Sequence, residues 1–87
     1  MQPIKLYTIY TEDTDREAVF AILDQYFDSY TVVPSIGHWK GHEEKSLVLQ
    51  IVTFDRDAVY LAANDIKLRN RQESVLVTEQ AITHNVI

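Results

Sequence analysis

A stretch of twelve residues, SIGHWKGHEEKS at positions 35–46, contains both glycines, the single tryptophan and two of the three histidines of the chain. Trp39 offers an aromatic plane for stacking, and Lys40 offers an ammonium group for a phosphate. His38 and His42 can each donate a hydrogen bond. These four side chains indicate a binding site for a small anionic, nucleotide-like ligand.

The same stretch also fits a structural hairpin. Gly37 and Gly41 permit positive φ or a close approach of two backbones, so the chain can turn between them. In that case Trp39 packs onto the domain or onto a neighbouring subunit. The two interpretations are compatible if the pocket lies between subunits.

Metal binding and catalysis find little support in the sequence. His38, His42, Glu43 and Glu44 are potential metal ligands, but a four-residue spacing of histidines aligns ligands on a helix, whereas this stretch is typical of a turn. The chain has no cysteine, no nucleophile elbow, no Gly-rich phosphate loop and no HExxH motif. We therefore expect no metal, no cofactor and no enzymatic activity.

A second group of charges lies at the end of a predicted helix. Lys67, Arg69 and Arg71 are candidate contacts for an anion. Cationic side chains at a helix C-terminus also complement the helix dipole, so a structural role is the alternative.

Composition restricts the class of protein. A chain of 87 residues makes one domain, and its net charge of −5 disfavours nucleic-acid binding, which needs a basic face. No apolar run is long enough to span a membrane, and the N-terminus lacks the pattern of a signal peptide. We expect a cytoplasmic protein, in the host cytoplasm if a phage encodes it.

Periodicity predicts the elements that hold the candidate site. Apolar residues at i, i+3, i+4, i+7 and i+8 predict a helix over 14–28. Thr14 and Glu17 form a capping-box pattern at its start. Asp55 is the predicted cap of a second helix over 56–70. Pro34 cannot donate to a ladder, so its strand belongs at a sheet edge. The order predicts an α+β, ferredoxin-like β-α-β-β-α-β domain over 1–80, with both helices on one face of an antiparallel sheet and a short tail over 81–87. The predicted strands are 4–10, 30–39, 45–53 and 74–80.

One face of such a sheet is free of helices. We assign Ile4, Leu6, Leu47, Leu49, Ile51, Val75 and Val77 to the helix side. The opposite face then remains apolar at positions that water would otherwise meet, and apolar patches of this kind usually mark an interface. We predict self-association into a dimer or trimer, with the apolar tail crossing to a neighbouring subunit or folding back over its own sheet. The predicted interface residues are Tyr7, Ile9, Val48, Val52 and Leu76.

The stretches YFDSYTVVPSIGHWKGHEEKSLVLQIV at 26–52 and NRQESVLVT at 70–78 resemble a group of short, mostly uncharacterised bacterial and phage-encoded proteins. The W-K-G at 39–41 and the E-K-S-L at 44–47 carry this resemblance. In topology the chain is similar to the nitrogen-signalling PII proteins and to CutA-type trimers. This likeness in topology implies sheets that pack together between subunits. For PII proteins it also implies nucleotides bound in clefts between subunits. This chain lacks the long nucleotide-contacting loop of PII proteins.

The sequence thus favours a non-catalytic, homo-oligomeric binding protein for a small anionic, nucleotide-like ligand. If the gene is viral, such a protein would act in anti-defence by sequestering an immune nucleotide signal of the host. The alternative is a small acidic protein-interaction module that inhibits a host or bacterial protein complex.

Overall fold

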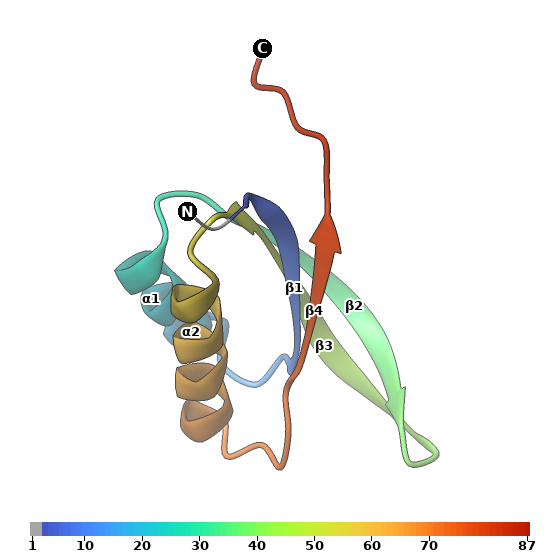
Figure 1. The fold of residues 1–87 in the computed structure, drawn as a ribbon. Helices are drawn as coiled ribbons and strands as arrows, with labels where there is room; N and C mark the ends of the chain where they lie inside the picture. Colours follow the sequence, from blue (N-terminus) through green and yellow to red (C-terminus); the bar gives the residue numbers. More distant parts are fainter. Residues whose placement is uncertain (1–2) are drawn as a thin grey trace.

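The computed structural model describes residues 3–87, which form one sheet and two helices (Figure 1). All neighbouring strands are antiparallel, and their order across the sheet is β2-β3-β1-β4. This arrangement confirms the predicted α+β, ferredoxin-like fold. The elements in chain order are β1 (Lys5–Glu12), α1 (Arg16–Tyr26), β2 (Thr31–Trp39), β3 (His42–Thr53), α2 (Arg56–Arg69) and β4 (Leu76–Ala81).

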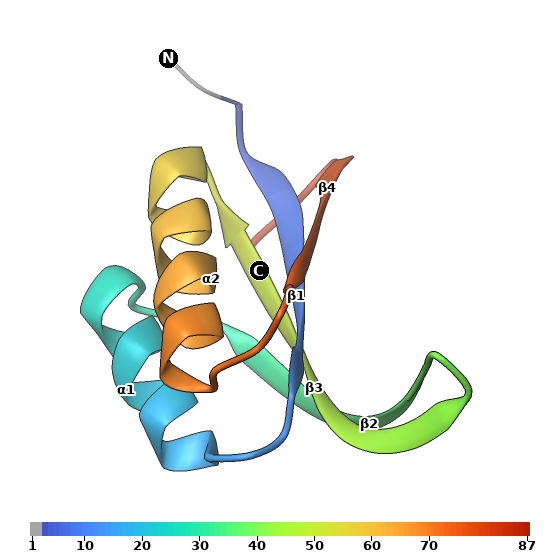
Figure 2. The same cartoon turned by 90° about the horizontal axis from the view of Figure 1, so that it is seen from below.

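Both helices lie on the same side of the sheet, and Figure 2 shows the other side free of helices. We call this helix-free side the open face. β2 is an edge strand, as the proline in it predicted, and Pro34 lies opposite Leu47 of β3. β4 forms the other edge. None of the helices within residues 3–87 has the length and apolar character needed to cross a membrane.

The two helix starts differ from each other in how well the sequence predicted them. Asp55 caps α2, and its carboxylate accepts a hydrogen bond of 3.1 Å from the backbone N–H of Ala58. The capping box at Thr14 is wrong, because Asp15 caps α1 and accepts from the N–H of Ala18, also at 3.1 Å. Thr and Asp are both good N-cap residues, and Thr14 and Asp15 are adjacent. The sequence therefore left the start of α1 uncertain by one residue.

The core lies between the two helices and the face of the sheet that they cover. It contains Tyr7, Ile9, Val19, Leu23, Leu47, Leu49, Ile51, Val59, Ala62, Ala63 and Ile66.

The prediction that Tyr7 and Ile9 belong to an oligomer interface on the open face is therefore wrong. Tyr7 lies opposite Ile51, and Ile9 lies opposite Leu49. Directly opposed residues share a face of the sheet, so both side chains point toward the helices. Ile4 and Leu6 consequently belong to the other side, and the remaining predicted interface residues, Val48, Val52 and Leu76, do lie on the open face.

Residues 82–87 continue from β4 and run away from the body of the domain (Figure 1). Val86 and Ile87 are exposed, and so are Val52 and Leu76 on the open face. The tail therefore leaves the open face of its own chain uncovered.

Candidate functional site

A groove of about 480 Å³ opens between the β2–β3 hairpin and the loop that joins α2 to β4. The end of β1 forms part of its lining. The lining residues are Tyr10, Thr11, Glu12, Gly37, His38, Trp39, Glu44, Ser46, Gln72, Glu73, Ser74 and Leu76. Two segments far apart in the sequence thus meet at one end of the sheet.

The hairpin wall is shaped by a two-residue turn. Lys40 and Gly41 connect β2 to β3 and have positive φ values of 50° and 81°. Two successive residues with positive φ are typical of a type I′ turn, whose twist matches that of the flanking strands. The hairpin curves away from the helices (Figure 2). Trp39 is the last residue of β2 before the turn, and 54% of its surface is exposed.

The loop wall is tied to β1 by side-chain hydrogen bonds. The hydroxyl of Thr11 donates to the side-chain oxygen of Gln72. The amide of Asn70 donates to the Thr11 hydroxyl at 3.3 Å and to the Gln72 oxygen at 3.2 Å. Thr11 is buried, and these bonds hold the loop against the sheet beside the groove.

The groove combines aromatic faces with carboxylates. Tyr10 is 41% exposed and, like Trp39, presents its ring to solvent. The carboxylates in the lining are those of Glu12, Glu44 and Glu73. Burial raises the pKa of Glu12, and the neighbouring carboxylate of Glu44 raises it further.

The lining therefore accepts hydrogen bonds more readily than it attracts an anion. A carboxylate accepts from N–H groups, whereas it repels a phosphate. Lys40 stands at the rim: its Nζ lies 5.7 Å from the centre of the Trp39 ring and 3.8 Å from a carboxylate oxygen of Glu73. At this rim an anionic group of a ligand could contact the ammonium group of Lys40.

The four predicted ligand contacts separate into two pairs. His38 and Trp39 line the groove, whereas Lys40 and His42 do not. His42 is opposite Trp39 in the ladder and is exposed. The Nε2 of His38 lies 3.8 Å from a carboxylate oxygen of Glu43, which is its cross-strand neighbour.

None of the three residues of the basic helix exit is among the lining residues of the groove. Arg69 makes an ion pair of 3.2 Å with Asp15, which caps α1. Lys67 lines a separate hollow of about 350 Å³ beside α2, together with Val75 and Val77. Arg71 is exposed and has a positive φ of 56° in the loop that leads to Gln72.

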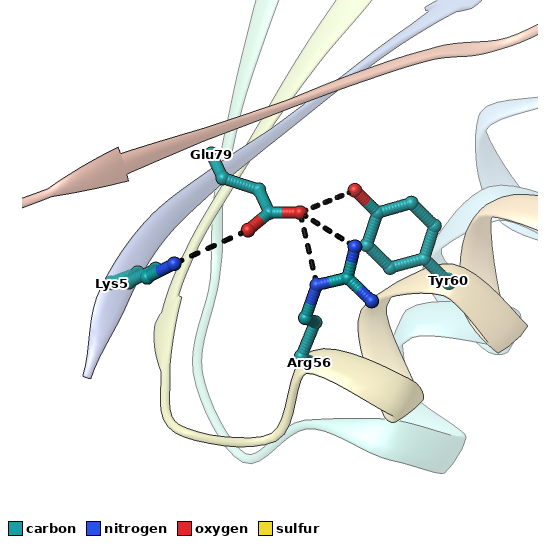
Figure 3. A network of polar contacts seen from close by, with 4 residues as sticks. All are labelled: Lys5, Arg56, Tyr60 and Glu79. Carbon is teal, nitrogen blue, oxygen red and sulfur yellow. Dashed lines mark hydrogen bonds and ion pairs between the residues drawn. The ribbon is translucent and has the colours of Figure 1, made fainter. Parts of the chain in front are cut away.

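Sequence reasoning missed a polar network centred on Glu79 (Figure 3). Glu79 accepts hydrogen bonds from the Tyr60 hydroxyl at 2.6 Å and from Arg56 Nε at 3.0 Å, and Lys5 Nζ lies 3.4 Å from its other oxygen. The bond from Tyr60 lowers the pKa of Glu79 most, and Arg56 lowers it further. The network links edge strand β4 to α2 and β1. Glu79 is far in the sequence from Lys5 and from the α2 pair Arg56 and Tyr60, so no local pattern indicated the network.

Within residues 3–87, no three His, Cys, Asp or Glu side chains are grouped as ligands of a metal ion would be.

No protein-family model and no curated protein matches the sequence. Solved structures do match the fold. A DUF3240 family protein from Shewanella baltica OS155 aligns over 100% of this chain and 98% of its own, with a TM-score of 0.73 and 8% identity. CPII, a nitrogen regulatory PII-like protein from Thiomonas intermedia K12 whose structure holds ADP, AMP and bicarbonate, aligns over 97% of both chains, with a TM-score of 0.68 and 17% identity.

At these identities the likeness concerns the fold alone. It supports the PII-type topology that the order of elements predicted. The resemblance to short bacterial and phage-encoded proteins through W-K-G and E-K-S-L stays a prediction. The chain is thus similar in architecture to a PII-like protein over nearly its whole length.

Proposed function

We propose that this protein binds a small nucleotide-like molecule without chemical turnover, as an assembly of identical chains, with the planar ring of the ligand in the groove beside Trp39. The observation that carries this proposal is an exposed tryptophan at the wall of a groove that also contains hydrogen-bond acceptors. A base stacked on an aromatic side chain gains about 1–3 kcal/mol.

The polar lining suits the edge of a nucleobase. Glu12 and Glu44 can accept hydrogen bonds from exocyclic amino groups or ring N–H groups. Tyr10 and Leu76 supply apolar surface to the lining of the groove. The ring therefore enters the groove, and the charged part of the ligand stays outside it.

The anionic part of the ligand is placed at the rim by charge. Lys40 and Arg71 are exposed, and each belongs to a segment that forms a wall of the groove. A phosphate contacting Lys40 would compete with the 3.8 Å pair between Lys40 and Glu73, which is exposed on both sides and weak. This arrangement keeps the phosphate away from Glu12 and Glu44.

The PII-like neighbour supports a ligand of this class. CPII has the same architecture, and its structure contains two adenine nucleotides together with bicarbonate. A protein that binds without turnover is also suited to sequestering a nucleotide signal, which is the anti-defence role if a phage encodes the chain.

Fluorescence titration tests the proposal, because Trp39 is the only tryptophan of the chain. We expect mono-, di- and cyclic nucleotides to include at least one that quenches or shifts the emission and raises the melting temperature. Nucleotide recovered after release should be chemically unchanged by mass spectrometry.

A pair of variants supplies the control. Trp39→Ala should weaken binding, measured by calorimetry, by roughly 5- to 150-fold, which corresponds to the loss of about 1–3 kcal/mol of stacking. Leu61→Ala removes an exposed side chain of α2 outside the groove and should leave affinity unchanged. Equal loss in both variants, or no nucleotide binding at millimolar concentration, would overturn the proposal.

A further inference from the structure

The aromatic and acidic side chains of the groove share one face of the sheet. Glu12 lies opposite Ser46 of β3, and Glu44 is two residues before Ser46, so both carboxylates lie on the open face. Gly37 lies opposite Glu44, and Trp39 follows Gly37 by two residues on β2, so the indole ring is on the same face. The hairpin end of the open face thus brings an exposed tryptophan together with two carboxylates.

These two carboxylates lack cationic partners. Within residues 3–87, neither Glu12 nor Glu44 makes an ion pair. The negative charge of Glu44 contributes to the raised pKa of Glu12, so the two carboxylates lie close enough to repel each other. A positive charge beside them would relieve this repulsion. The groove therefore holds uncompensated negative charge on the same face as an aromatic ring.

Gly37 leaves space beside the Glu44 carboxylate. The φ of Gly37 lies outside the left-handed region, unlike that of Gly41, so the backbone conformation does not require glycine. A Cβ atom at Gly37 would have Ser46 Oγ at 3.6 Å as its nearest non-adjacent neighbour, which is an ordinary van der Waals contact. The fold would therefore accept a side chain at this position. Because there is none, the space opposite Glu44 is available to a ligand.

Lys40 shows which chemistry the aromatic wall accepts. Its ammonium group lies 5.7 Å from the centre of the Trp39 ring and 3.8 Å from a carboxylate oxygen of Glu73. A cation held by one aromatic ring and one carboxylate is thus already present at the rim. The ion pair is exposed on both sides and weak, and Trp39 remains more than half exposed. The ring can therefore receive a cationic group of a ligand as well.

The charge of the ligand's ring then discriminates among nucleotides. A neutral base in this groove gains stacking and hydrogen bonds. A positively charged ring gains a cation–π interaction with Trp39 and attraction to the nearby carboxylates in addition.

We infer that the groove prefers nucleotides whose ring carries a positive charge, such as an N-alkylated purine or a pyridinium, and that Glu12 and Glu44 determine this preference. The inference rests on the proposed function and adds the chemical class of the ring to it. The phosphate stays beside Lys40 at the rim, so the ligand is positive at one end and negative at the other.

Pairs of nucleotides that differ in ring charge test the inference. Nicotinamide mononucleotide has a positively charged pyridinium ring, whereas the ring of its reduced form is neutral. 1-Methyl-AMP and AMP differ in the same way at pH 7. In calorimetry at pH 7, we expect the charged member of at least one pair to bind at least about tenfold more tightly than the neutral member.

Three glutamine variants test the residues. Glu12→Gln and Glu44→Gln each keep the shape of the side chain and remove one charge. Each should reduce the preference for the charged member at least about threefold, and should change the affinity for the neutral member by less than about twofold. Glu43→Gln is the matched control, because Glu43 is the exposed neighbour of Glu44 and lies outside the groove lining. It should keep the full preference.

Gly37→Ala tests the space beside Glu44. The added methyl group occupies that space, so binding of the charged member should weaken. The melting temperature should not fall, because alanine restricts the unfolded chain more than glycine does and fits the backbone here.

The outcomes separate the inference from the proposed function. If nucleotides bind but the two members of each pair bind equally, the inference is overturned and the proposed function stands. The same holds if the Glu12 and Glu44 variants keep the full preference, or if Glu43→Gln lowers it as much as Glu44→Gln does. If neither these four nucleotides nor the others of the fluorescence titration bind at millimolar concentration, both the inference and the proposed function fail.

Discussion

Ile9→Ala is the substitution that most sharply tests where β1 directs its side chains. Ile9 is fully buried and lies between Leu49 of β3 and Val77 of β4. Alanine removes three carbon groups, worth about 2.4 kcal/mol at about 0.8 kcal/mol each. The cavity left in a core that cannot collapse fully adds to this, so we expect a loss of about 3 kcal/mol or more.

That loss is a large fraction of the total stability of a small domain, which is about 5–15 kcal/mol. With a urea m-value of about 1.5 kcal/mol per molar, the unfolding midpoint should fall by roughly 2 M. Circular dichroism of the helices measures this transition. The assay should use one fixed protein concentration, because an assembly makes the midpoint depend on concentration.

Leu68→Ala is the matched control, since Leu68 is 66% exposed on α2. Its cost should stay within about 0.5 kcal/mol. A loss below about 1 kcal/mol in Ile9→Ala, similar to that of the control, would contradict the assignment of Ile9 to the core.

Two further predictions concern single contacts. Asp15→Ala should destabilise the protein by about 1 kcal/mol in urea unfolding because it removes the cap of α1, whereas Thr14→Ala should cost a few tenths at most; the reverse order would restore Thr14 as the cap. The hydrogen bond from Tyr60 is the main reason why the pKa of Glu79 in the folded protein lies below its ordinary value of 4.5. The ionised carboxylate therefore stabilises the fold at a pH above 4.5, and this stabilisation is lost as the pH falls through the lowered pKa. The difference in melting temperature between wild type and Glu79→Gln should therefore shrink from pH 7 to pH 3. Glu43→Gln, which changes an exposed pair, is the control and should differ little from wild type at either pH. A Glu79→Gln difference that does not depend on pH would contradict this explanation.

The sequence predicted the architecture because its strongest signals are local. The helical stripe from Val19 to Phe27, the cap at Asp55 and the proline in β2 each restrict one element, and together they allow few topologies. The structure agrees with all three.

The face of β1 was not predictable in the same way. Apolar residues occupy both alternating sets in IKLYTIY, so periodicity alone cannot decide whether Leu6 or Ile9 points to the core. The decision comes from the register with β3, in which Ile9 meets Leu49. Register is a long-range property that a single strand does not encode.

The candidate site was predicted on one side only. The glycines and histidines gathered around Trp39 indicated that the hairpin belongs to a site. Of the four predicted ligand contacts in this hairpin, His38 and Trp39 line the groove. The opposite wall, from Gln72 to Ser74, carries no motif, and only folding brings it near the hairpin. The carboxylate of Glu12 was likewise not expected at the site, since it comes from β1, whereas Glu44 belongs to the hairpin stretch itself.

Native mass spectrometry of the wild-type chain, with and without a nucleotide that changes Trp39 emission, tests the central claim most directly. The account predicts a single species whose mass is a whole multiple of the 10.1 kDa chain, and nucleotide bound in proportion to the number of chains. A lone 10.1 kDa species that retains no nucleotide would contradict it.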